Sequence, residues 1–117
     1  MFDPIEVLQE LIRIDTTNPP GREGPAVAVV RSLLDDAGIA TEELAKDPAR
    51  PNLIARIPGS GDAPPLLLQG HLDVVSTAGQ RWEHDPFGAE IVDGYLWGRG
   101  TLDMKGAVAM MLHALVT

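Results

Sequence analysis

Leu66-Leu67-Leu68 is an apolar run that leads directly into the polar segment Gln69-Gly70-His71-Leu72-Asp73. Its three consecutive leucines are typical of a central strand that is covered on both faces. The strand is expected to run out at His71, where polar residues begin. Side chains at positions i and i+2 of an extended segment point to the same face, so His71 and Asp73 are predicted to project together.

A second, glycine-rich segment follows, Gly98-Arg99-Gly100-Thr101-Leu102-Asp103-Met104-Lys105-Gly106. Its glycines indicate positive φ angles or a close approach of the backbone to another group. Asp103 lies at a strand-to-helix junction, where the helix N-terminus favours an acidic group and two carboxylate oxygens can bridge two cations. Two interpretations of Asp103 stay open from these residues alone: a metal ligand, or only the cap of the next helix.

The His-x-Asp pair also allows two interpretations. A histidine that binds a metal needs its ring fixed, and a nearby carboxylate is the usual means. The same tripeptide is compatible with a polar strand end that forms a local hydrogen bond. His71 and Asp73 therefore point to a metal site only in combination with other motifs.

The remaining elements are expected to alternate between helices and strands. Apolar spacing and caps predict helices near residues 3–14, 24–37 and 105–116, and alternation predicts strands near 39–44 and 52–57 with a hairpin around Asp93-Gly94. The turn-rich loop 15–21 is either a stiff connector or lines a site. This order predicts an α/β domain in which helices flank a mixed sheet.

Composition narrows the classes of function. The 117 residues suffice for one domain, and the net charge of −8 argues against a nucleic-acid partner, whose phosphates would repel it. No apolar stretch reaches the ~18 residues that span a bilayer, and no signal peptide is recognisable, so a cytoplasmic protein without membrane contact is expected. Because the chain has no cysteine, any metal must bind histidine and carboxylate.

No other catalytic chemistry is indicated by the sequence. It contains no His-Glu-x-x-His motif, no phosphate-binding loop and no serine nucleophile elbow. His84 lies in a turn-rich segment and is expected to be a surface-loop residue. His113 lies among apolar neighbours in the last helix and is expected to be a buried structural histidine.

The motifs taken together resemble one family. His71-Leu72-Asp73-Val74-Val75, then Trp82 with Asp85-Pro86-Phe87, then Asp93-Gly94 and then the segment 98–106 follow one another as in the co-catalytic zinc hydrolases. These include acetylornithine deacetylase, succinyl-diaminopimelate desuccinylase, aminoacylase and carboxypeptidase G. The resemblance extends over nearly the whole chain, including the loop 15–19. It implies a zinc-exopeptidase-like fold and zinc-dependent hydrolysis of an amide or peptide bond in N-acyl amino acids or small peptides.

The resemblance also implies a role for each site residue. His71 binds one zinc ion, Asp103 bridges two, and Asp73 is the catalytic residue that orients the metal-bound imidazole. Two Zn²⁺ ions, for which Co²⁺ can substitute, bind a hydroxide and polarise the scissile carbonyl, while a glutamate acts as general base. The family tends to have a cis peptide bond after the bridging aspartate, here Asp103-Met104.

The sequence departs from the family pattern after Asp103, where it contains no Glu and no further Asp. The family's Glu-Glu pair, a further carboxylate ligand and a late histidine are therefore absent. Residues 1–117 are expected to be an incomplete N-terminal part of a metallohydrolase catalytic domain, whose homodimeric parent carries a separate dimerisation domain. The isolated chain is expected to be inactive, since a stable zinc site takes about four ligands. The alternative is a non-catalytic truncated domain or a module that acts only with a partner that completes the site.

Overall fold

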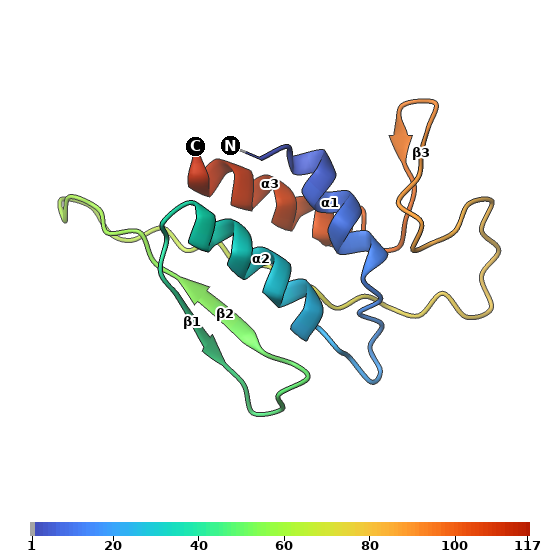
Figure 1. Ribbon diagram of the computed structural model, residues 1–117, viewed down its shortest axis with the longest axis horizontal. Coiled ribbons are helices and arrows are strands. Elements are labelled where there is room, and N and C mark those ends of the chain that lie inside the picture. Colours follow the sequence, from blue (N-terminus) through green and yellow to red (C-terminus); the bar gives the residue numbers. More distant parts are fainter. Residues whose placement is uncertain (1) are drawn as a thin grey trace.

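The computed structural model describes residues 2–117, which form three helices and two small antiparallel sheets (Figure 1). In chain order the elements are α1 (Pro4–Arg13), α2 (Gly24–Asp36), β1 (Thr41–Leu44), β2 (Asn52–Ala55), β3 (Ile91–Val92), β4 (Tyr95–Leu96) and α3 (Lys105–Val116). The predicted α/β class is confirmed. All three predicted helices and the hairpin lie within a few residues of their expected positions.

Helix α1 begins at Pro4 because the sequence supplies an N-cap residue followed by a proline. The side chain of Asp3 accepts a hydrogen bond from the backbone N–H of Ile5 at 2.8 Å, which satisfies a donor that the first turn leaves unpaired. Pro4 follows at the first helical position, where no N–H is needed. The helix then buries Val7 and Leu11 and exposes its polar face.

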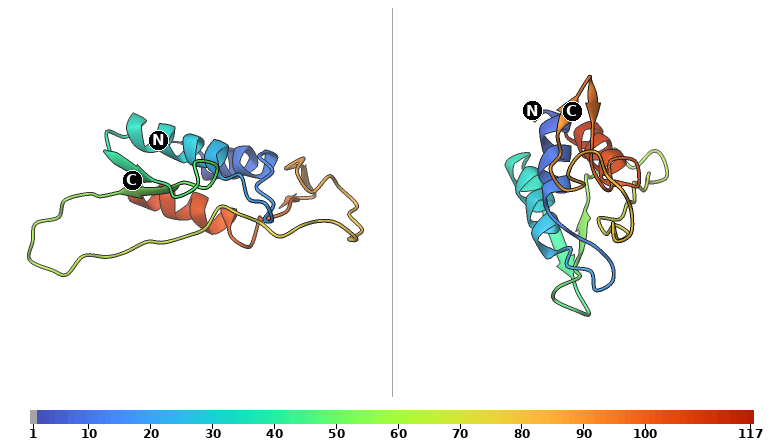
Figure 2. Two further views of the ribbon diagram at one scale, coloured as in Figure 1. Left: turned by 90° about the horizontal axis from the view of Figure 1, so that it is seen from below. Right: turned by 90° about the vertical axis from the view of Figure 1, so that its right-hand side faces the viewer.

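The core lies between the three helices, with the β1–β2 ladder against α2 (Figures 1 and 2). In that ladder Thr41 is opposite Ala55 and Leu44 is opposite Asn52. The buried residues that make up the core cluster are Val7, Leu11, Ala26, Val30, Leu34, Val108, Ala109 and Leu112. Because α1 and α3 pack against each other, the start of α3 is fixed near the end of α1.

The strand predicted at Leu66, Leu67 and Leu68 is wrong. These residues lie in an extended segment that pairs with no strand among residues 2–117, and Leu66 is 86% exposed. The left view of Figure 2 shows residues 58–72 running apart from β2. A strand needs a neighbour that takes its backbone hydrogen bonds, and an apolar run does not supply one. In place of a single mixed sheet, two separate two-stranded antiparallel sheets form, together with one isolated parallel bridge between Thr17 and Val74.

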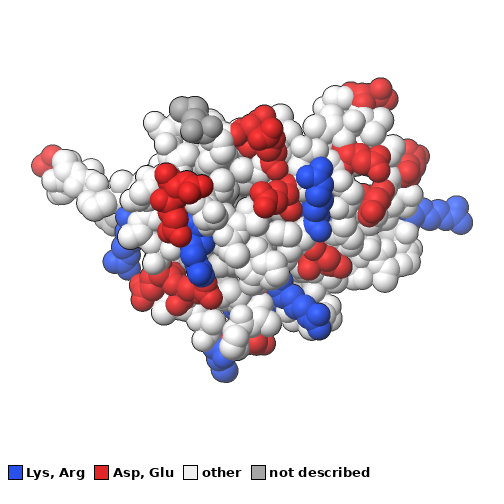
Figure 3. Space-filling model, viewed as in Figure 1, with Lys and Arg blue, Asp and Glu red and all other residues white. Residues whose placement is uncertain are grey.

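Two findings concern the surface. No helix among residues 2–117 is long and apolar enough to cross a membrane. Acidic side chains are spread over the face shown in Figure 3, which carries no large basic patch. That distribution agrees with the net charge of −8.

A buried lysine connects α1 to α3. The side chain of Lys105 is fully buried, and its Nζ donates hydrogen bonds to the carbonyl oxygens of Leu11 at 2.7 Å and Ile14 at 2.8 Å. Carbonyl groups at a helix C-terminus have no partner within the helix, so the lysine satisfies groups that would otherwise be buried unpaired. Burial lowers the pKa of Lys105 to about 8, although the charge of Asp15 opposes this shift.

We expect the free energy of unfolding to rise between about pH 8 and pH 10.5 because of Lys105. Its pKa is about 8 in the folded protein and 10.5 for an unperturbed lysine, so the unfolded state binds more protons within this window and stability increases with pH. The full shift corresponds to a rise on the order of 3 kcal/mol. Urea unfolding of chelator-treated protein at a series of pH values measures it.

The variant Lys105→Met should lose this rise. The matched control is Lys46→Met, since Lys46 is exposed in the turn between β1 and β2. The control should keep the pH dependence of the wild type. Equal pH dependence in the wild type and in Lys105→Met would contradict the assignment of the shift to Lys105.

Candidate metal centre

The structure brings together the three residues that the sequence singles out. Nδ1 of His71 lies 3.1 Å from Oδ1 of Asp73 and 3.0 Å from the backbone carbonyl oxygen of the same residue. Nε2 of His71 lies 3.0 Å from Oδ1 of Asp103. The imidazole therefore stands between two carboxylates, one from its own segment and one from the segment before α3.

Backbone hydrogen bonds hold the segment of His71 against the loop 15–18. The N–H of Val74 donates to the carbonyl of Thr16 at 3.1 Å, and the N–H of Asn18 donates to the carbonyl of Val74 at 2.9 Å. The hydroxyl of Thr16, which is fully buried, donates to the carbonyl of Leu72 at 2.6 Å. These bonds fix the backbone on both sides of Asp73.

Close packing at Gly100 brings the segment of Asp103 to the same place. Gly100 has φ +91°, and a Cβ there would lie 2.8 Å from the side chain of Val74. Only glycine combines this φ with this contact. The N–H of Lys105 donates to the carbonyl of Gly100 at 2.8 Å, so the chain folds back on itself around Asp103.

Asp103 does not cap α3. The N-cap residue of this helix is Met104, and no side chain forms a cap hydrogen bond there. The carboxylate of Asp103 instead faces His71 and is 87% exposed. The peptide bond between Asp103 and Met104 is cis, as the family resemblance implies, and the bonds Asn18–Pro19 and Pro19–Pro20 are also cis.

The electrostatics of the site favour a positive charge on or beside the imidazole. Burial lowers the pKa of His71, but its hydrogen bonds to the Asp73 carbonyl and the Asp103 carboxylate, with the charges of both aspartates, outweigh burial and raise the pKa above its usual 6.5. The hydrogen bond from Asn18 lowers the pKa of Asp73, and the charges of His71 and Arg50 add to this effect. Asp73 is therefore an ionised acceptor at neutral pH.

Sequence analysis did not single out three residues behind Asp73, namely Asn18, Arg50 and Glu23. Nδ2 of Asn18 donates to Oδ2 of Asp73 at 2.9 Å, and Nη2 of Arg50 lies 3.7 Å from the same oxygen. Arg50 is in turn paired with Glu23 at 2.7 Å. The turn-rich loop around Asn18 was the one available signal, and this contact places the loop beside Asp73.

The other two histidines lie apart from this arrangement. Nδ1 of His84 is 3.1 Å from Oε2 of Glu90, and its ring packs against Trp97 in the loop and hairpin region. His113, which was expected to be a buried structural histidine, contacts the ring of Phe2 edge-on and is only partly buried. His113 is not part of the core cluster, whose buried residues on α3 are Val108, Ala109 and Leu112.

The donors at Nε2 of His71 suit a divalent cation. Imidazole nitrogen and carboxylate oxygen bind Zn²⁺ at about 2.0–2.2 Å, and two such bonds at a tetrahedral angle place their atoms about 3.3 Å apart. The separation between Nε2 of His71 and Oδ1 of Asp103 is 3.0 Å, close to that value. Within residues 2–117, no group of three or more His, Cys, Asp or Glu side chains is arranged to hold one ion. The described residues thus supply two donors that fit the ion, short of a complete ligand set.

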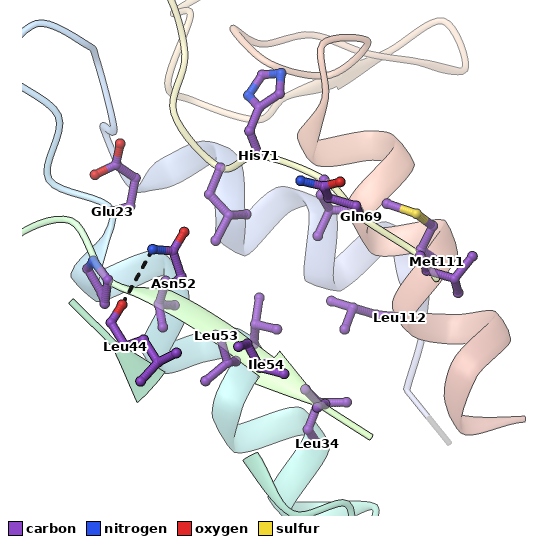
Figure 4. Close-up of a pocket in the computed structure, with 18 of the residues that line it drawn as sticks. Glu23, Leu34, Leu44, Asn52, Leu53, Ile54, Gln69, His71, Met111 and Leu112 are labelled. Atoms are coloured by element: carbon purple, nitrogen blue, oxygen red, sulfur yellow. Dashed lines mark hydrogen bonds between the residues drawn. The ribbon is translucent and has the colours of Figure 1, made fainter. Parts of the chain in front are cut away.

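The candidate centre lies at the polar end of an open pocket of about 1030 Å³. Glu23 and His71 stand at this end, whereas Leu34, Met111 and Leu112 line the remainder (Figure 4). The pocket is bounded by α2, β2, the extended segment before His71 and α3. A polar group at the imidazole would therefore have an apolar surface next to it.

The comparisons with known proteins agree with one another on the family that this chain resembles. The sequence profile of "Peptidase family M20/M25/M40" matches residues 67–117, which include His71, Asp73 and Asp103. The chain is 44% identical over 114 residues to a succinyl-diaminopimelate desuccinylase of Methylobacterium radiotolerans, an alignment that covers 94% of this chain and 28% of that protein. It is 38% identical over 115 residues to succinyl-diaminopimelate desuccinylase 1 of a Ruegeria species, with 97% and 29% covered. The chain therefore spans less than a third of the length of these relatives.

We expect Asp103→Asn to lower the pKa of His71 in metal-free protein. The substitution removes a negative charge and a strong acceptor 3.0 Å from Nε2, two of the causes that raise this pKa. A raised pKa in the folded state means that His71 contributes stability below its usual pKa and loses that contribution as the pH rises through its folded value. Asp103→Asn should therefore also reduce stability at acidic pH, but not above the folded pKa.

An NMR titration of the imidazole in the presence of a chelator measures the midpoint. The control is Asp62→Asn, because Asp62 is exposed in the loop before Leu66 and its replacement makes the same change in net charge. The midpoint should stay at the wild-type value in the control. An unchanged midpoint in Asp103→Asn would show that the His71–Asp103 contact is absent in solution.

Proposed function

This chain belongs to peptidase family M20/M25/M40, and we propose that the protein that carries it hydrolyses the amide bond of an N-acyl amino acid or small peptide with divalent metal ions bound. The arrangement of His71 between Asp73 and Asp103 is the observation that supports this proposal most directly. The relatives are named succinyl-diaminopimelate desuccinylases, so an N-succinyl amino acid is the first substrate to test.

In this proposal His71 and Asp103 are metal ligands and Asp73 is the residue that orients the imidazole. The charge of Asp73 at Nδ1 keeps the imidazole proton on that nitrogen, which leaves the lone pair of Nε2 for a bond to metal. The carboxylate of Asp103 has two oxygens and can bridge a second ion. Bound Zn²⁺, or Co²⁺ in its place, would polarise the amide carbonyl and lower the pKa of a water molecule toward 7.

The two donors on this chain do not complete such a site. A zinc ion takes about four ligands, so we propose that the remaining ligands and the general base come from residues outside 2–117. The relatives are more than three times as long as the stretch that aligns with this chain, which leaves room for those residues. The alternative is a module that becomes active only beside a partner that supplies them. A cytoplasmic location and a homodimeric parent stay predictions from the sequence.

A chimera tests the proposed roles. Residues 1–117 replace the aligned segment of the desuccinylase of Methylobacterium radiotolerans, so that the rest of that enzyme is present. The chimera should bind about two zinc ions and hydrolyse succinyl-diaminopimelate, since our proposal makes this segment the source of two metal ligands. The variants His71→Ala and Asp103→Ala should each lose activity by about 1000-fold or more, because each removes stabilisation by a metal ion worth several kcal/mol.

The matched control is His84→Ala in the same chimera. His84 pairs with Glu90 away from the centre, so its loss should leave metal content and activity within about twofold of the unsubstituted chimera. The 117-residue chain alone should bind Zn²⁺ weakly and show no amidase activity. Full activity in the His71→Ala chimera would contradict the assignment of His71 as a metal ligand.

A further inference from the structure

A chain of alternating charges leads from α2 to the candidate centre. Glu23 precedes α2, is only 7% exposed, and accepts hydrogen bonds from Nε of Arg50 at 3.1 Å and from Nη2 of Arg50 at 2.7 Å. The same Nη2 lies 3.7 Å from Oδ2 of Asp73. Asp73 faces Nδ1 of His71 with its other oxygen. These four side chains thus form a path that ends at the ring nitrogen opposite the one that faces Asp103.

The guanidinium of Arg50 is held in one position. Its Nε donates to Oε2 and its Nη2 to Oε1 of the buried Glu23 carboxylate, a two-pronged pair with a fixed planar geometry. Gly21 lies directly against it with φ +77°, and a Cβ at this position would collide with Nε of Arg50. The N–H of Gly24 also donates to the carbonyl of Ala49 at 3.3 Å, which ties the turn that carries Arg50 to the start of α2. Arg50 is therefore ordered before any ligand binds.

The two oxygens of Asp73 have different partners. Oδ2 accepts from Asn18 and faces Arg50, whereas Oδ1 faces His71. A carboxylate held at one oxygen cannot rotate freely, so its second oxygen stays at the imidazole. Asn18 supplies a neutral hydrogen bond for this purpose, and Arg50 supplies the only positive charge that the described contacts place beside Asp73 other than His71 itself.

We infer that Arg50 is a positioning residue that acts through Asp73 to keep the imidazole proton of His71 on Nδ1 and its Nε2 open to a metal ion. The inference rests on the proposed role of His71 as a ligand. If Asp73 turns away, Nδ1 keeps only the backbone carbonyl as a partner, and the tautomer with its proton on Nε2, facing Asp103, gains population. Residues that orient a metal-bound histidine typically change metal affinity by 10- to 100-fold when replaced.

The test uses the full 117-residue chain and a double variant, Glu23→Gln with Arg50→Gln. Replacing both partners avoids leaving the buried Glu23 carboxylate without a counter-charge. In metal-free protein above the pKa of His71, ¹⁵N NMR of the ring should show a smaller fraction of the Nδ1–H tautomer than in the wild type. The affinity for Zn²⁺, measured by competition with a chromophoric chelator, should fall about tenfold, near the lower limit for such residues.

The matched control removes another Arg–Glu pair that also involves α2. Arg31 on this helix pairs with Glu43 on β1, and the double variant Arg31→Gln with Glu43→Gln should leave both measurements within about twofold. In an Asp73→Asn background, replacing Glu23 and Arg50 should have no further effect on Zn²⁺ affinity, because the proposed route runs through Asp73. Arg50→Lys keeps the charge without the two-pronged bond, so its affinity should lie between those of the wild type and the double variant.

Each outcome decides one question. If Asp73→Asn changes tautomer and affinity but the Glu23/Arg50 double variant changes neither, Arg50 serves only Glu23 and the inference is overturned. If the wild type and His71→Ala bind Zn²⁺ equally, the ligand role fails, and the tautomer in metal-free protein still reports on Arg50. If the double variant does not fold, Arg50→Lys supplies the test. Wild-type tautomer and affinity in that variant would then overturn the inference, because a lysine side chain cannot form the two-pronged bond.

Discussion

The bonds from the buried Lys105 ammonium to the carbonyls of Leu11 and Ile14 fix the start of α3 on the end of α1. Asp103 lies two residues before this anchor, and the N–H of Lys105 is bonded to Gly100. A Cβ at Gly106 would collide with the backbone of Thr101, so the segment between the two glycines is also closely packed. The carboxylate of Asp103 is exposed, yet the backbone that carries it is held by groups in the core. That constraint places Asp103 at His71 without any contact of its own to the protein interior.

The helices of this fold could be predicted because their signals are local. Asp3 and Pro4 define the start of α1, and apolar residues at helical spacing define the buried faces of all three helices. The hairpin followed from Asp93-Gly94, and both residues have the positive φ that such a turn requires, +52° and +82°. Each of these signals depends on residues only a few positions apart.

The strand at Leu66, Leu67 and Leu68 could not be predicted in the same way. A continuous apolar run shows that the side chains favour burial, but it carries no information about which backbone would pair with theirs. Among residues 2–117 no strand takes that place, so the three leucines remain exposed, and Leu67 and Leu68 lie beside the pocket. The general class α/β survives this error because it depends on the order of elements, whereas the sheet depends on contacts between distant residues.

The candidate centre shows the same division between local and distant information. His71, Asp73 and Asp103 were found because their motifs are contiguous and follow one another in a specific order. Arg50 lies just before β2 and Arg56 just after it. No feature of the sequence indicates which of the two arginines lies near the candidate centre. The bond between Gly24 and Ala49 places Arg50 beside Glu23 and Asp73, and this is a tertiary contact.

The two ring nitrogens of His71 differ in how firmly this chain holds their partners. Nδ1 faces Asp73, which is itself held by Asn18 and Arg50, whereas Nε2 faces the exposed carboxylate of Asp103. Ordering a side chain during binding costs free energy and weakens the affinity. On the Nδ1 side, contacts within the chain order His71 before any ligand binds, so this cost does not reduce the binding affinity. If His71 is the proposed ligand, the segment presents an oriented nitrogen, and further ligands need only approach from the open side. Such a half-site would bind metal weakly alone. It would bind metal tightly once further ligands complete it, because His71 is already oriented.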